Sequence, residues 1–228
     1  MGTLVELEPP APRLVEELRR RWQLTITAEE AKRAFASEIR YYKAHHLEGR
    51  DSRSVAALRR RCAAVLQAAL PVSVRDRIPA AEVEPALLAS LRFRLYPDVA
   101  ESLPALRAAG LKLAVVSNWD VSLGDVLADL GAAELVDRIV TSAEVGAAKP
   151  APALFRRALE ELDVEASEAV HVGDSPALDL TGAEAAGIES ILIDRGRHDP
   201  PAPAATRRID SLTELLASAG PLALPPPR

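Results

Sequence analysis

The sequence lacks several features that would assign it to particular classes of protein. Cys62 is the only cysteine among 228 residues, so no disulfide can form within the chain and a reducing compartment is expected. No uninterrupted apolar run reaches the ~18 residues that a membrane-spanning helix needs. The first residues show no basic start followed by an apolar stretch, the mark of a secretory signal. Together these absences favour a cytoplasmic protein.

Negative charge is in slight excess, and lysine is scarce. The formal net charge is -5 and the sequence pI is about 5.5, which argues against a surface for nucleic acid or for an anionic membrane. Only four of the 28 basic residues are lysines, so Lys149 stands out among many arginines. The length suits one large domain, or a core that carries an inserted subdomain, and it does not indicate an oligomeric state.

Two regimes of predicted secondary structure follow one another. From about residue 11 to residue 92 the apolar residues recur at three- and four-residue intervals, which predicts helices that each bury one stripe. Thr27 and Glu30 form a capping-box pattern that opens a helix toward His46, and Asp51 or Ser52 can cap the next one. A third helix is predicted over residues 79–93. This part of the chain should form a small helical bundle.

Short apolar strands alternate with helices from Tyr96 onward. Asp98 is predicted to cap a helix that ends at Gly110, and residues 111–117 predict a strand buried on both faces. Helices are expected at 122–131, 152–162 and 178–187, strands at 138–142, 169–173 and 190–194, and a capping box at 211–214 opens a last helix. This alternation predicts βαβ units around a parallel sheet.

Three motifs stand where predicted strands or their loops end. Ser117-Asn118 closes one strand, Lys149-Pro150 lies in a loop, and Gly173-Asp174 closes another strand shortly before Asp179. Since ligands gather at the carboxyl ends of parallel strands, these groups should share one rim. Each has a simpler interpretation alone: a strand end, a solvated loop lysine and a helix N-cap.

In this order the motifs suit phosphoryl transfer. Ser117 and the backbone of Asn118 can donate to one phosphoryl oxygen, and Lys149 can neutralise another. Asp174, with Asp179, can hold Mg²⁺, which prefers hard oxygen ligands. Asp179 could instead support Lys149.

The segment from Leu111 to Ile193 resembles the haloacid dehalogenase-like (HAD) hydrolase superfamily in its second, third and fourth motifs. The resemblance implies an α/β fold with a Rossmann-like parallel sheet and an inserted helical cap. It also implies a Mg²⁺-dependent hydrolase, most simply a phosphatase that attacks a small phosphate ester through an aspartyl-phosphate. On that basis residues 1–10 are a remnant of the first motif and a linker. Residues 11–95 are the cap, residues 96–218 the hydrolase core and residues 219–228 a flexible tail.

The first motif is incomplete in this sequence. Gly2-Thr3-Leu4 matches the end of the family's pattern, with Thr3 at a phosphate-binding position, and Met1 stands where the general acid/base would be. The nucleophilic aspartate would fall two residues before Met1, on a first core strand that is missing from this chain. We therefore expect the catalytic activity of this form to be impaired. A longer in-frame product is expected to supply the nucleophilic aspartate and the first core strand.

Two other functions fit the same motifs. A 2-haloacid dehalogenase uses the fold without a metal, although Asp174 beside Asp179 gives such an enzyme no advantage. A non-catalytic binding protein is the other alternative, although it would have no reason to keep Lys149 and both aspartates. The sequence does not indicate the substrate.

Overall fold

The computed structural model describes residues 2–196 and 206–217. The predicted tail at 219–228 and the position of Met1 therefore lie outside the described residues. The chain divides into two compact units. One comprises Leu7–Arg94 with Asp120–Ser122, and the other comprises Met1–Glu6, Leu95–Trp119 and Leu123–Arg228.

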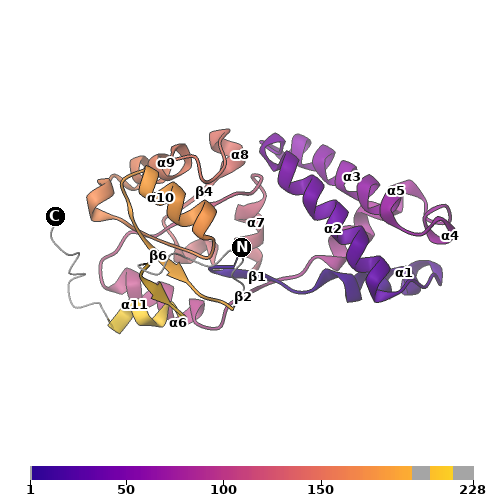
Figure 1. Cartoon of the computed structure of the whole chain (residues 1–228), viewed down its shortest axis with the longest axis horizontal. Helices are drawn as coiled ribbons and strands as arrows, with labels where there is room; N and C mark the ends of the chain where they lie inside the picture. The colour runs from indigo at the N-terminus through magenta and orange to yellow at the C-terminus, as the bar shows by residue number, and fades with distance from the viewer. Residues whose placement is uncertain (1, 197–205, 218–228) are drawn as a thin grey trace. The chain divides into compact units, whose positions relative to one another are not determined.

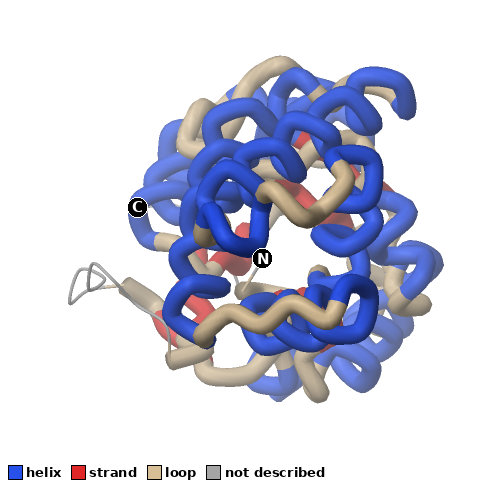
Figure 2. Tube along the Cα trace, turned by 90° about the vertical axis from the view of Figure 1, so that its right-hand side faces the viewer, coloured by secondary structure: helices blue, strands red, loops and turns tan. Residues whose placement is uncertain are grey.

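The first unit is helical, as predicted. Its helices are α1 (Pro10–Trp22), α2 (Ala28–His45), α3 (Ser52–Ala69), α4 (Val72–Arg75) and α5 (Ala80–Ser90), with a 3₁₀ turn at His46–Glu48. In Figure 2 its helices are drawn in blue and the loops that join them in tan. Over the described part of the chain, no helix combines the length and apolarity needed to cross a membrane.

Local signals set the starts of the two longest helices. The Thr27 side chain accepts from the Glu30 backbone N–H, and the Glu30 carboxylate accepts from the Thr27 N–H, which is the predicted capping box. Asp51 caps α3 through the Ser54 N–H at 2.7 Å. The apolar stripes of α1, α2, α3 and α5 then pack into one core that includes Leu14, Phe35 and Leu58.

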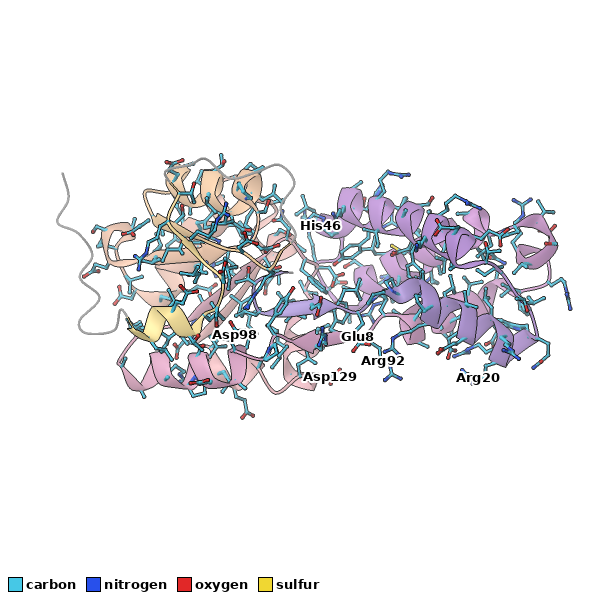
Figure 3. All side chains as sticks on the ribbon, turned by 60° about the horizontal axis from the view of Figure 1, so that its bottom comes forward. Glu8, Arg20, His46, Arg92, Asp98 and Asp129 are labelled. Atoms are coloured by element: carbon cyan, nitrogen blue, oxygen red, sulfur yellow. The ribbon has the colours of Figure 1, made fainter. Side chains whose placement is uncertain are left out.

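Two short strands carry the chain out of the α/β unit and back. β1 (Val5–Leu7) pairs with β2 (Phe93–Leu95) in a two-stranded sheet. The ladder continues where the Glu8 N–H donates to the Arg92 carbonyl at 2.9 Å, and both residues are labelled in Figure 3. These strands were not predicted, because residues 79–93 were assigned to a single helix. α5 ends at Ser90 instead.

The second unit alternates strands and helices, as predicted. Its strands are β3 (Ala114–Ser117), β4 (Arg138–Thr141), β5 (Val170–Gly173), β6 (Glu189–Ile193) and β7 (Arg208–Ile209). Its helices are α6 (Val99–Ala108), α7 (Leu123–Asp129), α8 (Ser142–Val145), α9 (Ala153–Leu162), α10 (Thr181–Ala185) and α11 (Thr213–Ala217). Shorter helical turns lie at Ala133–Leu135, Ala166–Glu168 and Pro176–Leu180.

All the strand pairs of this core are parallel. β3 pairs with β4, β5 pairs with β6, and β6 pairs with β7. Figure 1 shows α9 and α10 on one side of these strands and α6 and α11 on the other. The unit is thus a three-layer α/β fold of Rossmann-like type, with the helical unit inserted after Glu6.

One expectation about the core was wrong. Residues 111–117 were predicted to form a strand buried on both faces, but β3 begins only at Ala114 and its first three residues are half-buried. β5 shows the same pattern, whereas the last three residues of β6 are buried. The reason is a cavity along β3 and β5, which leaves these strands without full cover.

Asp98 also behaves differently from the prediction. It precedes α6, but its side chain makes no capping hydrogen bond there. The carboxylate instead pairs with Arg195 at 3.0 Å and accepts from the Leu212 N–H at 2.7 Å. Asp98 is labelled in Figure 3. Burial alone would raise the pKa of Asp98, but the Arg195 hydrogen bond and the Leu212 N–H hold it below its usual value. Asp98 therefore ties the start of α6 to the start of α11.

Candidate active site

The predicted site residues meet at the carboxyl ends of β3 and β5. One cavity of about 760 Å³ is lined by Thr3, Ser117, Lys149, Asp174 and Asp179. Ser117 ends β3, and Asp174 follows the last residue of β5. The sequence motifs predicted this shared rim from the direction of parallel strands. Asn118 is not among the lining residues.

Asn118 positions the loop that carries Lys149. Its Oδ1 accepts from the Lys149 backbone N–H at 2.7 Å, and its Nδ2 donates to the Lys149 carbonyl at 3.1 Å. This two-way contact fixes the Lys149 backbone against the residue that follows β3. Asn118 therefore supports the site through its side chain, and its backbone N–H remains the group proposed for phosphate.

The ammonium group of Lys149 lies in a buried network of charge. Its Nζ contacts Oδ1 of Asp179 at 2.5 Å and donates to the Val116 carbonyl at 3.0 Å. His171 Nε2 lies 3.2 Å from the same Asp179 oxygen, and the Ser175 N–H donates to Oδ2 at 2.9 Å. The network aims Lys149 at the carboxyl end of β3.

Asp179 stays ionised in this network. Burial would raise its pKa, but the hydrogen bond from His171 and the charge of Lys149 outweigh burial and hold the pKa well below its ordinary value. The Asp179 side chain is 5 % exposed and that of Lys149 is 11 % exposed, so water screens the pair poorly.

Gly173 allows Asp179 to approach the end of β5. A Cβ atom at position 173 would lie 2.3 Å from the Asp179 Cβ, a distance that no packed side chain tolerates. The structure shows that a protein side chain, Asp179, fills that space.

The N-terminal segment reaches the same rim. Thr3 Oγ1 donates to Oδ1 of Asp174 at 3.0 Å. Gly2 adopts a φ of +99°, and a Cβ there would lie 2.0 Å from Oδ2 of Asp174. Gly2-Thr3 therefore lies beside the fourth motif, where a remnant of the first motif would be needed.

The sequence matches the model of the haloacid dehalogenase-like hydrolase family over residues 1–187. The chain belongs to this family. The recognition made from the three motifs is thereby confirmed.

Curated relatives of this HAD hydrolase match over part of their length. Haloacid dehalogenase-like hydrolase domain-containing protein 3 of Mus musculus is 48 % identical over 92 residues, which are 40 % of this chain and 37 % of that protein. The phosphoserine phosphatase of Thermus thermophilus is 37 % identical over 126 residues, which are 54 % of this chain and 51 % of that protein. Across these two relatives the chain spans from 37 % to 51 % of the relative's length.

Solved HAD structures share the fold over nearly the whole chain. A HAD phosphatase from Thermococcus onnurineus is 25 % identical with a TM-score of 0.63, covering 96 % of this chain and 94 % of its own. A 2-haloacid dehalogenase from Pseudomonas syringae is 26 % identical with a TM-score of 0.62, covering 94 % and 93 %. The fold therefore fits both chemistries.

The carboxylates at the rim differ in their capacity to hold a metal. Both oxygens of Asp179 already accept hydrogen bonds from protein groups, whereas Asp174 receives one from Thr3. Within residues 2–196 and 206–217, no cluster of three or more His, Cys, Asp or Glu residues could hold a metal by itself. Mg²⁺ needs only one or two protein carboxylates and keeps several waters, so Asp174 fits as its single ligand here.

Sequence reasoning missed the role of His171. It packs edge-on against Phe155, with ring centroids 4.9 Å apart. However, its Nε2 also contacts the Asp179 carboxylate. Since β5 alternates its side chains, His171 and Gly173 point to the same face, which is the one signal that could have linked them.

Two further polar residues of the helical unit are buried. His46 is 8 % exposed. Asp120 accepts from the Tyr42 hydroxyl at 3.0 Å and from the Ser122 N–H at 2.8 Å. Asp120 thereby holds the turn 120–122 against α2.

Proposed function

We propose that this HAD hydrolase is a Mg²⁺-dependent phosphatase of a small phosphate ester. One observation supports the proposal most strongly: Ser117, Lys149 and Asp174 line one cavity at the carboxyl ends of β3 and β5. A hydroxyl donor, an ammonium and a carboxylate suited to a cation are the groups that a phosphoryl group in transfer requires. The named phosphatases among the relatives, such as the phosphoserine phosphatase, are in line with this substrate class.

Each residue has a distinct task in this proposal. Ser117 donates a hydroxyl hydrogen bond to a phosphoryl oxygen, and the backbone N–H of Asn118 adds another. Thr3 can bind a phosphoryl oxygen in the same way only when its hydroxyl proton turns away from Asp174. Lys149 neutralises negative charge as the bond to the leaving oxygen breaks, and Asp179 with His171 keeps Lys149 in place. Asp174 would hold Mg²⁺, which screens the charge between the phosphate and the attacking carboxylate.

In this proposal the attacking carboxylate is not one of the described carboxylates that line the cavity. Asp174 and Asp179 line the cavity, but both have other tasks in the proposal. In the proposed reaction a further aspartate forms a bond to phosphorus, the ester oxygen leaves and takes a proton, and water then releases phosphate from the aspartyl-phosphate. We therefore expect the 228-residue form to be impaired.

The test compares two forms of the protein. The 228-residue form is expected to release negligible p-nitrophenol from p-nitrophenyl phosphate in the presence of Mg²⁺. The in-frame product that extends upstream of Met1 should turn over, and its Lys149→Met and Asp174→Asn variants should lose that activity. Robust Mg²⁺-dependent turnover by the short form would contradict the assigned nucleophile, and an in-frame stop directly upstream would remove the longer product.

A dehalogenase is the second candidate, because the Pseudomonas syringae 2-haloacid dehalogenase matches across nearly the whole chain. Halide release from a 2-haloacid in the presence of EDTA would favour it. Phosphate release that EDTA abolishes would favour the phosphatase. An extended form that does neither would leave the non-catalytic binding protein as the better account.

A further inference from the structure

The main chain of Thr3 is held by a side chain from the far end of the α/β unit. Arg195, which lies shortly beyond the last residue of β6, donates from Nη2 to the Thr3 carbonyl at 3.0 Å. The two residues are 192 positions apart in the sequence. Because the donor is a charged guanidinium, this bond is stronger than one between neutral groups. Arg195 therefore contributes to the placement of Thr3.

Two side chains fix the guanidinium group of Arg195. Its Nη1 lies 3.0 Å from Oδ2 of Asp98 and its Nη2 lies 3.0 Å from Oδ1, a two-pronged contact that suits the planar shape of both groups. Its Cζ lies 4.2 Å from the centre of the Tyr96 ring. The side chains of Arg195 and Asp98 are 9 % and 11 % exposed, so water screens this pair poorly. Arg195 is thus a well-oriented donor.

The neighbouring backbone groups of this segment have partners of a different kind. The Gly2 N–H donates to the Val5 carbonyl at 2.9 Å, and the Leu4 carbonyl accepts from the Tyr96 N–H at 3.0 Å. These are bonds between main-chain groups, whereas the Thr3 carbonyl is bound by a side chain. The Thr3 hydroxyl belongs to the same residue, so a shift of the Thr3 main chain would also move its hydroxyl.

We propose that Arg195 is a positioning residue of the candidate active site. Through the Thr3 carbonyl it holds the Thr3 hydroxyl on Oδ1 of Asp174, and so sets the direction of the carboxylate that would hold Mg²⁺. Arg195 is not among the residues that line the cavity, so it acts through Thr3 and not on the substrate. Its importance for catalysis rests on the proposed function, whereas the chain of contacts from Arg195 to Asp174 does not.

A purely structural role is the alternative, because the ion pair of Arg195 with Asp98 also ties α6 to α11. Matched variants separate the two roles. Asp98→Asn breaks the ion pair and leaves Arg195 beside the Thr3 carbonyl, whereas Arg195→Met removes both contacts. Arg195→Met also leaves the buried Asp98 charge without its partner, which can prevent folding. The double variant Asp98→Asn/Arg195→Met removes both charges together and is compared with Asp98→Asn alone.

Carbon NMR of the full chain, labelled at the carboxyl carbon of aspartate, provides the readout. The Asp174 resonance is assigned by its absence in Asp174→Asn, and Thr3→Val defines how far it shifts when the hydroxyl is lost. Arg195→Met should shift this resonance in the same direction as Thr3→Val and by a comparable amount. The double variant should do the same relative to Asp98→Asn. Asp98→Asn alone should leave the resonance near its original position.

Three results would overturn the proposal. In the first, the Asp174 resonance stays in place when Arg195 is replaced, although Thr3→Val shifts it. In the second, Asp98→Asn shifts it as far as Arg195→Met does, which would reduce Arg195 to a tie between helices. In the third, Thr3→Val itself leaves it unmoved, so the contact through which Arg195 acts is absent in solution. Neither phosphatase activity nor metal binding is measured, so failure of the proposed function leaves these outcomes unaffected.

Discussion

The Thr3 hydroxyl donates to the Asp174 carboxylate at 3.0 Å, although 171 positions separate the two residues in the sequence. This contact joins the end of the first motif to the fourth motif. It also orients the rim carboxylate that we propose as a metal ligand. The N-terminal segment is therefore a structural part of the candidate site.

The Thr3→Val variant should lose about 1.5 kcal/mol of the free energy of unfolding, because Asp174 loses a hydrogen bond to a charged acceptor. Urea denaturation followed by circular dichroism measures this change. Thr3→Ser is the matched control, since it keeps the hydroxyl and should stay near the stability of the original chain. A loss of stability in Thr3→Ser with none in Thr3→Val would show that the methyl group, and not the hydrogen bond, stabilises this position.

The buried Lys149–Asp179 pair should be strongly coupled. Lys149→Met leaves the buried Asp179 carboxylate without its counter-charge, and Asp179→Asn does the same to the Lys149 ammonium. Each loss typically lowers the free energy of unfolding by about 3–5 kcal/mol. The double variant should lose clearly less than the sum of the two single losses. A urea-denaturation cycle of the four proteins measures this coupling, and additive losses would mean that the contact contributes little.

The stabilisation that Asp179 gives to the folded state should also decrease as the pH falls. Its folded-state pKa is depressed, so its stabilisation is present above the unfolded pKa of about 3.9 and is lost as the pH falls through the lower folded value. The stability gap between the original chain and Asp179→Asn should therefore shrink in acid. Denaturation midpoints at pH 7 and pH 3 provide the comparison.

Glu38 should produce the opposite trend in the helical unit. Burial raises its pKa, and the hydrogen bond with the Cys62 thiol offsets this rise only in part. A raised folded pKa gives stability below the unfolded pKa that is lost as the pH rises through the folded value. Glu38→Gln should therefore gain stability relative to the original chain between pH 4 and pH 7. Glu16→Gln, an exposed change on α1, is the control and should show no such trend.

The sequence predicted features that depend on neighbouring residues or on strand direction. The Thr27–Glu30 capping box lies within one turn, so a local pattern was enough to place the start of α2. Ser117, Lys149 and Asp174 were predicted to share a rim because parallel strands end at one edge of a sheet. Both predictions concern geometry that the backbone imposes.

Features that depend on distant partners could not be read in the same way. Asp98 has the local context of an N-cap, but Arg195 and Leu212 take its carboxylate from 97 and 114 positions away. The sequence does not indicate the contact of His171 with Asp179, because this contact requires the helical turn after β5 to fold back. The half-buried state of β3 depends on a cavity shared with β5, which no local apolar pattern can indicate.

Cys62 offers a direct test of the helical core. It is 3 % exposed, and burial with the nearby Glu38 carboxylate raises its pKa to about 12. Because the thiolate is the reactive form, the native thiol should resist Ellman's reagent at pH 8, by about 100-fold or more compared with the protein in 8 M urea. Absorbance at 412 nm follows the reaction. Fast reaction of the native protein would show that α2 and α3 open readily around Cys62, in conflict with the packing of this core. A Cys62→Ala variant should give no signal in either state, which assigns the absorbance to this single thiol.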